Sequence, residues 1–429
     1  MLDLKLIREQ EARVRTALER RGAHVDLDGL LALDREWRAA VQEVETLKQE
    51  RNSVSKEIGQ RKQAGEDTAD QQARMRAVGE RVADIDRANR ERLEAMDRLL
   101  LTLPNLPCDE APVGPDASGN RLVRTVGEPR HFDFEPRTHV DLAESLQLVD
   151  FARAARMSGA GFAVYTGAGA RLERALIQFM LDLHTREHGY TEISPPFVCN
   201  TEAMTGTGQL PKMAEDMYAI PEDGLYLIPT AEVPVTNLYR TETLEGPLPL
   251  AHVAYTPCFR REAGAAGRET RGLIRMHQFD KVELVRFVEP ETSYQQLELL
   301  VTHAEEVLKR LGLTYRILEL CTGDLSFAAA RCYDIELWAP GQGDWLEVSS
   351  CSNFEDFQAR RAGIRYRPDG GKPRWVHTLN GSGVALARLY VAILENYQTA
   401  DGGVTLPEAL VPYMGGIERL SPGPAAGST

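Results

Sequence analysis

The sequence predicts an α+β protein in which an antiparallel sheet flanked by helices follows an N-terminal antiparallel α-helical coiled-coil arm. The first hundred residues contain no proline before Pro104 and repeat apolar residues at helical spacing. From about residue 120 onward, short strands with turn signals are mixed with single helices, such as 168–188 and 291–312. Because strands and helices do not alternate strictly, the pattern favours an antiparallel sheet over a doubly wound parallel one.

Two apolar series mark the helices of the arm. In each, residues recur at spacings of three and four, which is the narrow stripe of a coiled coil. The first series is Leu30, Leu33, Trp37, Val41, Val44, Leu47, Val54 and Ile58, and the second is Met75, Val78, Val82, Ile85, Leu93, Met96 and Leu100. A polar stretch around Gly65 separates them and is typical of a turn. About 30 residues per helix predict a projecting arm of about 45 Å; a dimerisation coiled coil and part of a helical bundle are the alternatives.

A proline-rich segment follows the arm and divides the chain. Its four prolines, Pro104, Pro107, Pro112 and Pro115, cannot continue a helix. We therefore expect an arm at 1–103, a linker at 104–120, a second domain at 121–420 and a disordered tail at 421–429.

The composition excludes several classes of protein. The chain has 429 residues, a net charge of −14 and 43% hydrophobic residues, which is ordinary for a globular protein. It contains no apolar stretch of about 18 residues and no apolar signal core, so we expect no membrane contact and a cytoplasmic location. Six cysteines without a CxxC pair argue against a zinc knuckle and for reduced thiols.

Two stretches of the arm differ from the whole chain in the sign of their charge. The stretches 35–62 and 71–98 together contain 14 Lys and Arg against 11 Asp and Glu. Any positive potential is therefore expected in the arm, and such a surface contacts nucleic acid mainly through the phosphate backbone.

The densest polar stretch, 259–283, is the best candidate for a chemical site. The chain has no P-loop and no HExxH motif. The stretch is typical of two strands joined by a glycine-containing loop, with Arg260 and Glu262 on one face of the first strand. On the second strand one face would carry Arg275, His277, Phe279, Lys281 and Glu283. Such a polar face is costly in a core unless it meets a ligand or paired partners; the alternative is a solvated outer strand with cross-strand ion pairs.

This stretch resembles motif 2 of the class II aminoacyl-tRNA synthetases, and most closely that of the seryl-tRNA synthetases. Four further segments resemble that family in the family's order. They are 189–196 (motif 1, at the dimer interface), 227–234 (the serine-binding loop), 347–354 (the metal and ATP strand) and 380–388 (motif 3). The predicted hairpin is similar to the family's tRNA-binding arm, so the resemblance covers nearly the whole chain.

The resemblance implies a reaction in two steps, in a class II catalytic domain. L-serine would be activated with ATP to seryl-adenylate, and the seryl group would pass to the 3′ end of tRNA(Ser) and also of tRNA(Sec). The implied cofactor is Mg²⁺, and the implied assembly is a homodimer. A synthetase-like paralogue that loads a carrier other than tRNA and a non-catalytic regulator are the alternatives; the hairpin and the retained ATP residues argue against them.

The resemblance also implies roles for individual residues. Arg260, Glu283 and Arg388 would be catalytic, with Arg260 binding both the α-phosphate and the serine carboxylate. Serine would be bound by Thr230, Ala231, Glu232, Arg260, Glu283 and Ser382. ATP would be bound by Arg260, Arg261, Glu262, Arg271, Met276, Phe279, Glu347, Val348, Ser349, Ser350 and Arg388. Mg²⁺ would be held by Glu347 and Ser350, and tRNA by Arg35, Arg38, Lys48, Arg51, Lys56, Arg74, Arg76 and Arg81.

Motif 3 departs from the family pattern at two positions. Ala387 stands before Arg388 where glycine is usual, and Leu389 stands after it where threonine is usual. We expect the Ala387 methyl group to affect the fine geometry of ATP binding without changing the class of reaction.

Overall fold

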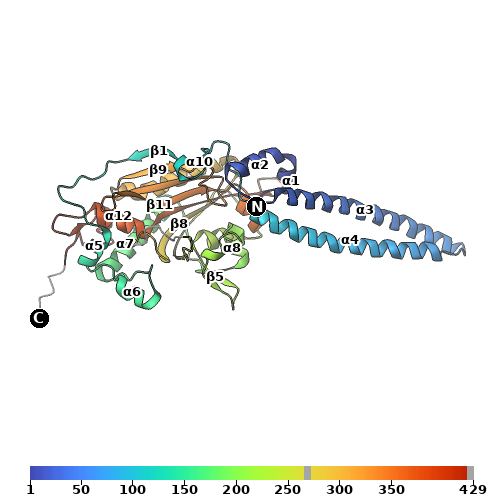
Figure 1. Ribbon diagram of the computed structural model, residues 1–429, viewed down its shortest axis with the longest axis horizontal. Helices are drawn as coiled ribbons and strands as arrows, with labels where there is room; N and C mark the ends of the chain where they lie inside the picture. Colours follow the sequence, from blue (N-terminus) through green and yellow to red (C-terminus); the bar gives the residue numbers. More distant parts are fainter. Residues whose placement is uncertain (265–271, 423–429) are drawn as a thin grey trace. The chain divides into compact units, whose positions relative to one another are not determined.

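The computed structural model describes residues 1–264 and 272–422, which form two units. One unit comprises Leu2–Val14 and Ala23–Pro104; the other comprises Met1, Arg15–Gly22 and the chain from Asn105 onward (Figure 1). Arg271 lies outside the described residues, as does the predicted tail from residue 423.

The N-terminal unit is dominated by an antiparallel helical hairpin, as the sequence predicts. The hairpin helices are α3 (Leu27–Gln63) and α4 (Ala69–Thr102) (Figure 1). Two short helices precede them in the chain, α1 (Leu4–Glu9) and α2 (Glu11–Arg20), and α2 is divided between the two units. α3 begins at an N-cap, because the Asp26 carboxylate accepts a hydrogen bond from the Gly29 N–H. The hairpin helices have 37 and 34 residues, so they are longer than the predicted 30.

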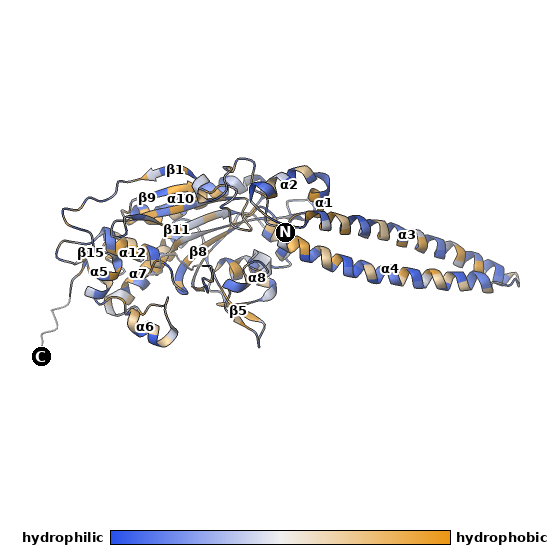
Figure 2. Ribbon diagram, in the orientation of Figure 1, coloured by the Kyte–Doolittle hydropathy of each residue, from blue (hydrophilic) through white to orange (hydrophobic). Residues whose placement is uncertain are grey.

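A thin apolar seam joins the two hairpin helices. Val44, Val82 and Ile85 are buried together, with Ala40 and Leu47 packed beside them. Figure 2 shows hydrophobic residues at intervals along both helices, separated by hydrophilic ones. The prediction for Leu93 is wrong: its side chain is 40% exposed. The buried positions of α4 continue instead through Asn89 and Met96, which places Leu93 beside the seam rather than in it.

The second unit is built on an eight-stranded sheet in the order β1-β9-β10-β11-β14-β8-β7-β2. All neighbouring strands pair antiparallel except β2 and β7, which are parallel. The strands are β1 (Arg121–Val126), β2 (Thr191–Glu192), β7 (Leu250–Phe259), β8 (Gln278–Val288), β9 (Tyr315–Glu319), β10 (Arg331–Ala339), β11 (Asp344–Asn353) and β14 (His377–Ala385). The predicted fold class, an antiparallel sheet flanked by helices with an N-terminal helical hairpin, is therefore confirmed.

Helices cover the sheet and form the main hydrophobic core with it. Buried side chains come from α5 (His139–Ser145), α7 (Gly167–Arg186), α10 (Ser293–Arg310) and α12 (Leu386–Asn396). On β8, Val282 and Leu284 belong to this core, whereas the alternating residues Lys281 and Glu283 line a cavity on the other side.

Smaller elements complete the second unit. The helices are α6 (Phe151–Ser158), α8 (Thr201–Thr207), α9 (Glu232–Thr236) and α11 (Phe357–Ala362). There are also three small sheets among the described residues. The first contains β3 (Val198–Asn200), β5 (Leu225–Leu227) and β4 (Ala219–Ile220), and the second contains β13 (Arg374–Trp375), β12 (Arg365–Tyr366) and β6 (Thr243–Leu244). The third contains β15 (Val404–Thr405) and β16 (Arg419–Leu420). Within the residues that the structure describes, no helix combines the length and the apolar run needed to cross a bilayer.

The segment that the sequence predicts as a linker packs within the second unit. Asn105 is buried, and its side-chain amide donates hydrogen bonds to the carbonyls of Ala328 and Phe354, both at 2.9 Å. Farther along, a Cβ on Gly114 would come within 2.9 Å of the Cys321 Sγ, so the chain there lies close against the body of the unit.

Two β-bulges change which side chains face the cavity. Between β10 and β11, the register steps by one residue from Ile335 to Glu336 but by two from Ser349 to Glu347, so Val348 is the extra residue. Between β14 and β8, the register steps by two residues from Ser382 to Val384 on β14 but by one on β8, so Gly383 is the extra residue. An extra residue reverses the alternation of the strand beyond it.

Candidate functional site

A cavity of about 650 Å³ lies in the second unit, and most of the predicted site residues line it. Twelve of them do so: Thr230, Glu232, Arg260, Glu262, Met276, Phe279, Glu283, Glu347, Val348, Ser350, Ser382 and Arg388. They come from segments far apart in the sequence. The sheet and the turns beside it therefore bring together the residues that the family resemblance selects.

Three predicted residues lie outside the cavity wall. Ala231 is fully buried in a small core cluster, because the neighbouring residues Thr230 and Glu232 take the positions facing the cavity. Ser349 is also buried, and its hydroxyl donates to the carbonyl of Ser382 at 2.6 Å. The Arg261 guanidinium lies 6.0 Å from the centre of the Tyr218 ring, consistent with its pointing away from Arg260.

The buried polar cluster of the cavity is centred on Glu283. Its carboxylate pairs with the Lys281 ammonium at 2.5 Å and accepts a hydrogen bond from the Asn380 amide at 2.9 Å. Lys281 also donates to the Thr230 hydroxyl at 2.8 Å. Ser382 lies directly across the strand pair from Glu283, with its hydroxyl 3.5 Å from the carboxylate. These groups are paired with one another and still offer oxygen atoms to a small polar ligand.

Glu232 is a second buried carboxyl group in the same cavity. Its Oε1 accepts a hydrogen bond from the Gln358 amide at 2.6 Å. Burial raises the pKa of Glu232 to about 7, and the negative charge of Glu283 adds to the effect. A cation entering this region would therefore meet a carboxyl group that ionises readily in its presence.

Arg260 lines the cavity beside Phe279 and the segment that carries Thr230. Its guanidinium lies 5.2 Å from the centre of the Phe279 ring, and its Nε donates to the carbonyl of Pro229 at 3.3 Å. Pro229 precedes Thr230, so these two contacts hold the guanidinium between an aromatic surface and the buried polar cluster. A fork of N–H donors in this position suits an anion.

The predicted strands around Arg260 are too long. β7 ends at Phe259 and β8 begins at Gln278, so Arg260, Glu262, Arg275 and His277 all lie beyond strand ends. His277 does not share the face of Phe279: its ring packs 5.5 Å from that of Phe162, away from the cavity wall. Irregular backbone replaces strand alternation there, and Glu262 itself has a positive φ of 51°.

A second group of contacts surrounds Arg388. Its Nε donates to the carbonyl of Ile274 at 3.1 Å, and NH1 donates to the carbonyl of Glu347 at 2.6 Å. Arg275 forms an ion pair with Glu262 nearby in the wall. With Phe279, these side chains provide planar cationic and aromatic surfaces that can stack on a base.

Glu347 and Ser350 fit a magnesium ion by their chemistry and by their placement. Glu347 and Ser350 are three residues apart, so on a regular strand their side chains would face opposite sides. The β-bulge at Val348 changes the alternation, and both residues line the cavity. Burial raises the pKa of Asp334, which pairs across the strands with Ser350, and the charge of Glu347 raises it further. A hard divalent cation binds oxygen donors and would lower the repulsion between the two neighbouring carboxyl groups. Among the residues described, no group of three or more His, Cys, Asp or Glu side chains is arranged to hold a metal ion.

Three residues of the site, Lys281, Asn380 and Gln358, were assigned no role from the sequence. Lys281 had a signal, because it alternates with Phe279 and Glu283 on β8. Asn380 had one too, since it begins motif 3. Gln358, which holds Glu232, had none: a glutamine on a short helix resembles many surface residues.

The two departures in motif 3 have different surroundings. Ala387 lines the cavity and is 5% exposed, so its methyl group forms part of the wall. Leu389 is fully buried in the main core and faces away from the cavity. Of these two residues, only Ala387 can contact a ligand in the cavity.

The eight predicted tRNA-binding cations of the hairpin divide into two sets. Four form ion pairs within the hairpin unit: Arg38 with buried Asp34, Lys48 with Asp86, Arg74 with Glu50, and Arg81 with Glu43. Arg35, Arg51, Lys56 and Arg76 are exposed and form no ion pair in the described structure. The second set presents its charge to solvent.

Comparison with known proteins gives one family match in the N-terminal hairpin region and another in the second unit. Residues 1–107 match the seryl-tRNA synthetase N-terminal domain, and residues 217–397 match the class II tRNA synthetase core domain (G, H, P, S and T). The chain is 56% identical to serine–tRNA ligases of Pelotomaculum thermopropionicum and Carboxydothermus hydrogenoformans. These alignments cover 98% of this chain and 100% and 99% of the relatives.

A solved structure agrees with these matches. The seryl-tRNA synthetase from Pyrococcus horikoshii complexed with ATP superposes with a TM-score of 0.94 and 38% identity, covering 99% of this chain and 100% of that one. Matches over the full length, including the hairpin, do not favour a carrier-loading paralogue. With the ordered motifs and the cavity that unites them, they show that the chain belongs to the seryl-tRNA synthetase (serine–tRNA ligase) family.

Proposed function

We propose that this chain activates L-serine with ATP to form seryl-adenylate and transfers the seryl group to the 3′ end of tRNA(Ser). One observation carries the proposal: a single cavity contains the buried carboxyl groups of Glu232 and Glu283 together with Arg260, Phe279 and Arg388. The carboxyl groups suit the ammonium group of an amino acid, and the other three suit phosphate and an aromatic base.

In the first step the chain holds and neutralises the reactants. The Arg260 guanidinium binds the α-phosphate and the serine carboxylate together, because it lies between Phe279 and the loop carrying Thr230. The serine carboxylate oxygen then attacks the α-phosphorus in line, and pyrophosphate leaves. No protein nucleophile is required; the side chains lower the barrier by orientation and by preorganised charge.

Glu347 and Ser350 would hold Mg²⁺ in this proposal. When bound, the ion neutralises phosphate charge and helps to orient ATP. In the second step a ribose hydroxyl of the tRNA 3′ end attacks the seryl-adenylate carbonyl, and AMP leaves. Arg260 and Arg388 keep the adenylate in place during this transfer.

The Glu283 cluster selects serine. Glu283, Ser382 and Thr230 have further hydrogen-bonding capacity for the serine hydroxyl, whereas alanine has no group to use it. Threonine adds a methyl group that the cluster must exclude by shape.

ATP–pyrophosphate exchange without tRNA tests this proposal. With Mg²⁺ present, exchange with serine is expected to exceed exchange with alanine by about 10⁴-fold in kcat/KM, with glycine and threonine also measured. Activation of another amino acid in preference to serine would contradict the assignment of the pocket.

The hairpin binds tRNA in this proposal, through phosphate and shape more than through base edges. Glu36 and Arg92 form an ion pair at 3.3 Å between the two hairpin helices. Residues 41–88, which lie between this pair and the hairpin turn and include the turn, can therefore be replaced by a short glycine-serine linker. The shortened protein is expected to retain serine-dependent exchange and to lose tRNA charging. Unimpaired charging would show that the hairpin is not the tRNA-binding element.

We also propose tRNA(Sec) as a second acceptor, a homodimeric assembly and a cytoplasmic location. Recognition through backbone and shape supports the first, because it does not require the base sequence of one tRNA. The exposed edge strand β2, within the segment similar to motif 1, supports the second, and six free cysteines support the third. Charging of both transcribed tRNAs, light scattering and cell fractionation test these points in turn.

A further inference from the structure

Residues 273–276 form part of the cavity wall without belonging to a strand. Leu273, Ile274, Arg275 and Met276 line the cavity, whereas β8 begins only at Gln278. Peptide groups outside a sheet need other hydrogen-bond partners when they are buried, and Leu273 is only 1% exposed. The partners of this segment therefore decide how the wall is placed.

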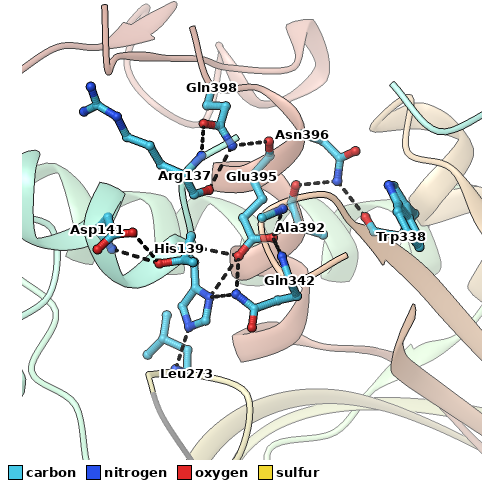
Figure 3. Close-up of polar contacts among 12 residues, drawn as sticks. Arg137, His139, Asp141, Leu273, Trp338, Gln342, Ala392, Glu395, Asn396 and Gln398 are labelled. Carbon is cyan, nitrogen blue, oxygen red and sulfur yellow. Dashed lines mark hydrogen bonds and ion pairs between the residues drawn. The ribbon is translucent and has the colours of Figure 1, made fainter. Parts of the chain in front are cut away.

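One of these partners is His139, the first residue of α5. The Leu273 N–H donates a hydrogen bond to the His139 Nε2 at 3.1 Å (Figure 3). A nitrogen that accepts a hydrogen bond must carry a lone pair, so the imidazole proton resides on Nδ1. Nδ1 lies 3.0 Å from Glu395 Oε1 and donates to it. The bond to Glu395 thus holds the imidazole in the tautomer that can accept from Leu273.

Glu395 is a rigid anchor for this imidazole. Its carboxylate is fully buried and also accepts hydrogen bonds from the backbone N–H groups of His139, Gly341 and Gln342, and from the Gln342 side chain, at 2.8–3.2 Å. Figure 3 shows the donors of His139 and Gln342 converging on Glu395, with the imidazole between Glu395 and Leu273. Multiple donors satisfy a buried carboxylate and restrict its movement.

Helix α12 therefore holds the wall segment at two adjacent residues. Arg388 of α12 donates directly to the carbonyl of Ile274, and Glu395 of the same helix acts on the N–H of Leu273 through His139. The fit is close, because a Cβ on Gly272 would come within 2.2 Å of the His139 Nε2. The next residue, Arg275, forms the ion pair with Glu262.

We propose that His139 is a positioning residue for ATP: it fixes the 273–276 backbone so that Arg275, Glu262 and Met276 are placed for the nucleotide. This inference rests on the proposed function. His139 itself does not line the cavity and belongs to none of the motifs in which the sequence resembles the family.

Two substitutions separate the two hydrogen bonds of the imidazole. Asparagine has its amide at the level of Nδ1, so His139→Asn keeps a donor for Glu395 and removes the acceptor for Leu273. Glutamine reaches the level of Nε2, so His139→Gln keeps the acceptor for Leu273. We expect H139N to raise the KM for ATP in the exchange reaction about tenfold, with the KM for serine changed less than about twofold, and H139Q to remain within about threefold of the parent for both.

Tyr239→Phe is the matched control for general loosening. It removes the 2.8 Å hydrogen bond to another buried histidine, His252, and neither residue lines the cavity. We expect Y239F to lower the thermal midpoint as much as H139N does without changing the KM for ATP. An unchanged KM for ATP in H139N, an equal rise in both KM values, or the same rise in Y239F would overturn the proposal.

Direct titration with ATP and Mg²⁺ keeps this test separate from the proposed function. If the parent protein failed to exchange with serine, the proposed function would fail. Calorimetric ATP affinities of the same variants would still decide the role of His139, with about tenfold weaker binding expected for H139N and parent-like binding expected for H139Q.

Discussion

The hairpin and the cavity both pair arginine or lysine with carboxylates, but they do so in different surroundings. In the hairpin, Arg81 and Glu43 are 60% and 45% exposed, and such pairs contribute about 0–1 kcal/mol to stability. In the cavity, Lys281 and Glu283 are 8% and 1% exposed, so removal of one partner leaves an uncompensated charge. Ion pairs in the hairpin thus add little to stability and leave the unpaired cations to meet a large anion in solvent, whereas the charges in the cavity are held in a fixed arrangement.

The largest effect is expected from Arg260→Gln. The guanidinium is the only cation proposed to contact both the α-phosphate and the serine carboxylate, so its loss removes stabilisation at the reacting atoms. We expect serine-dependent exchange to fall about 10³-fold in kcat. The thermal midpoint checks that the fold is retained; a fall below tenfold in a folded variant would contradict the role of Arg260.

The next effect is expected from Glu232→Gln, which should raise the KM for serine about 100-fold by removing a charge partner of the ammonium group. In the parent, burial raises the pKa of Glu232 to about 7. Serine needs the ionised carboxyl group, so its KM should be flat above pH 7 and rise about tenfold per pH unit below it. The E232Q variant should lack this dependence between pH 6 and 8.

The raised pKa of Glu232 makes the pH dependence of stability opposite to that of serine binding. A folded-state pKa above the ordinary value means that the folded protein binds the proton more tightly than the unfolded chain. The contribution of Glu232 to the free energy of unfolding is therefore present at low pH and is lost as the pH rises through 7. A serine KM that did not depend on pH in the parent would place the ammonium group elsewhere.

A smaller effect should separate the two sets of hairpin cations. Substituting the unpaired Arg51, Lys56 and Arg76 with glutamine should raise the KM for tRNA about 30-fold and reduce the salt dependence by about three phosphate contacts. The matched variant R74Q/R81Q, which changes paired cations, should raise it less than about threefold. Exchange without tRNA should be unchanged in both, and equal losses of charging would show that the ion pairs open when tRNA binds.

The smallest effect is expected in the seam. Val44→Ala removes buried methyl groups beside Val82 and Ile85 and should cost about 1 kcal/mol, seen as faster hydrogen exchange in α3 and α4. Leu93→Ala is the control, since its side chain is 40% exposed and should cost less than about 0.5 kcal/mol. If the two variants exchanged equally fast, the seam would not run as described.

The sequence predicted what depends on local period and on ordered motifs. Helical spacing identified the hairpin, and strand alternation placed Phe279, Lys281 and Glu283 on one face of β8. It failed where geometry departs from the regular period, as at His277 beyond the end of β8 and at Leu93 beside the seam. It also missed partners such as Gln358 and His139, because their roles arise from contacts between segments far apart in the chain and leave no local pattern.

The two bulges carry a consequence for how this site can change. Val348 and Gly383 each shift the phase of a strand by one residue, and the shift decides that Ser350 and Ala385 face the cavity. Deleting either residue would leave all other residues unchanged, but it would turn the side chains of the rest of the strand to the opposite face of the sheet. The site can therefore exchange one side chain for another far more easily than it can gain or lose a residue, and length variation in this family should avoid these two strands.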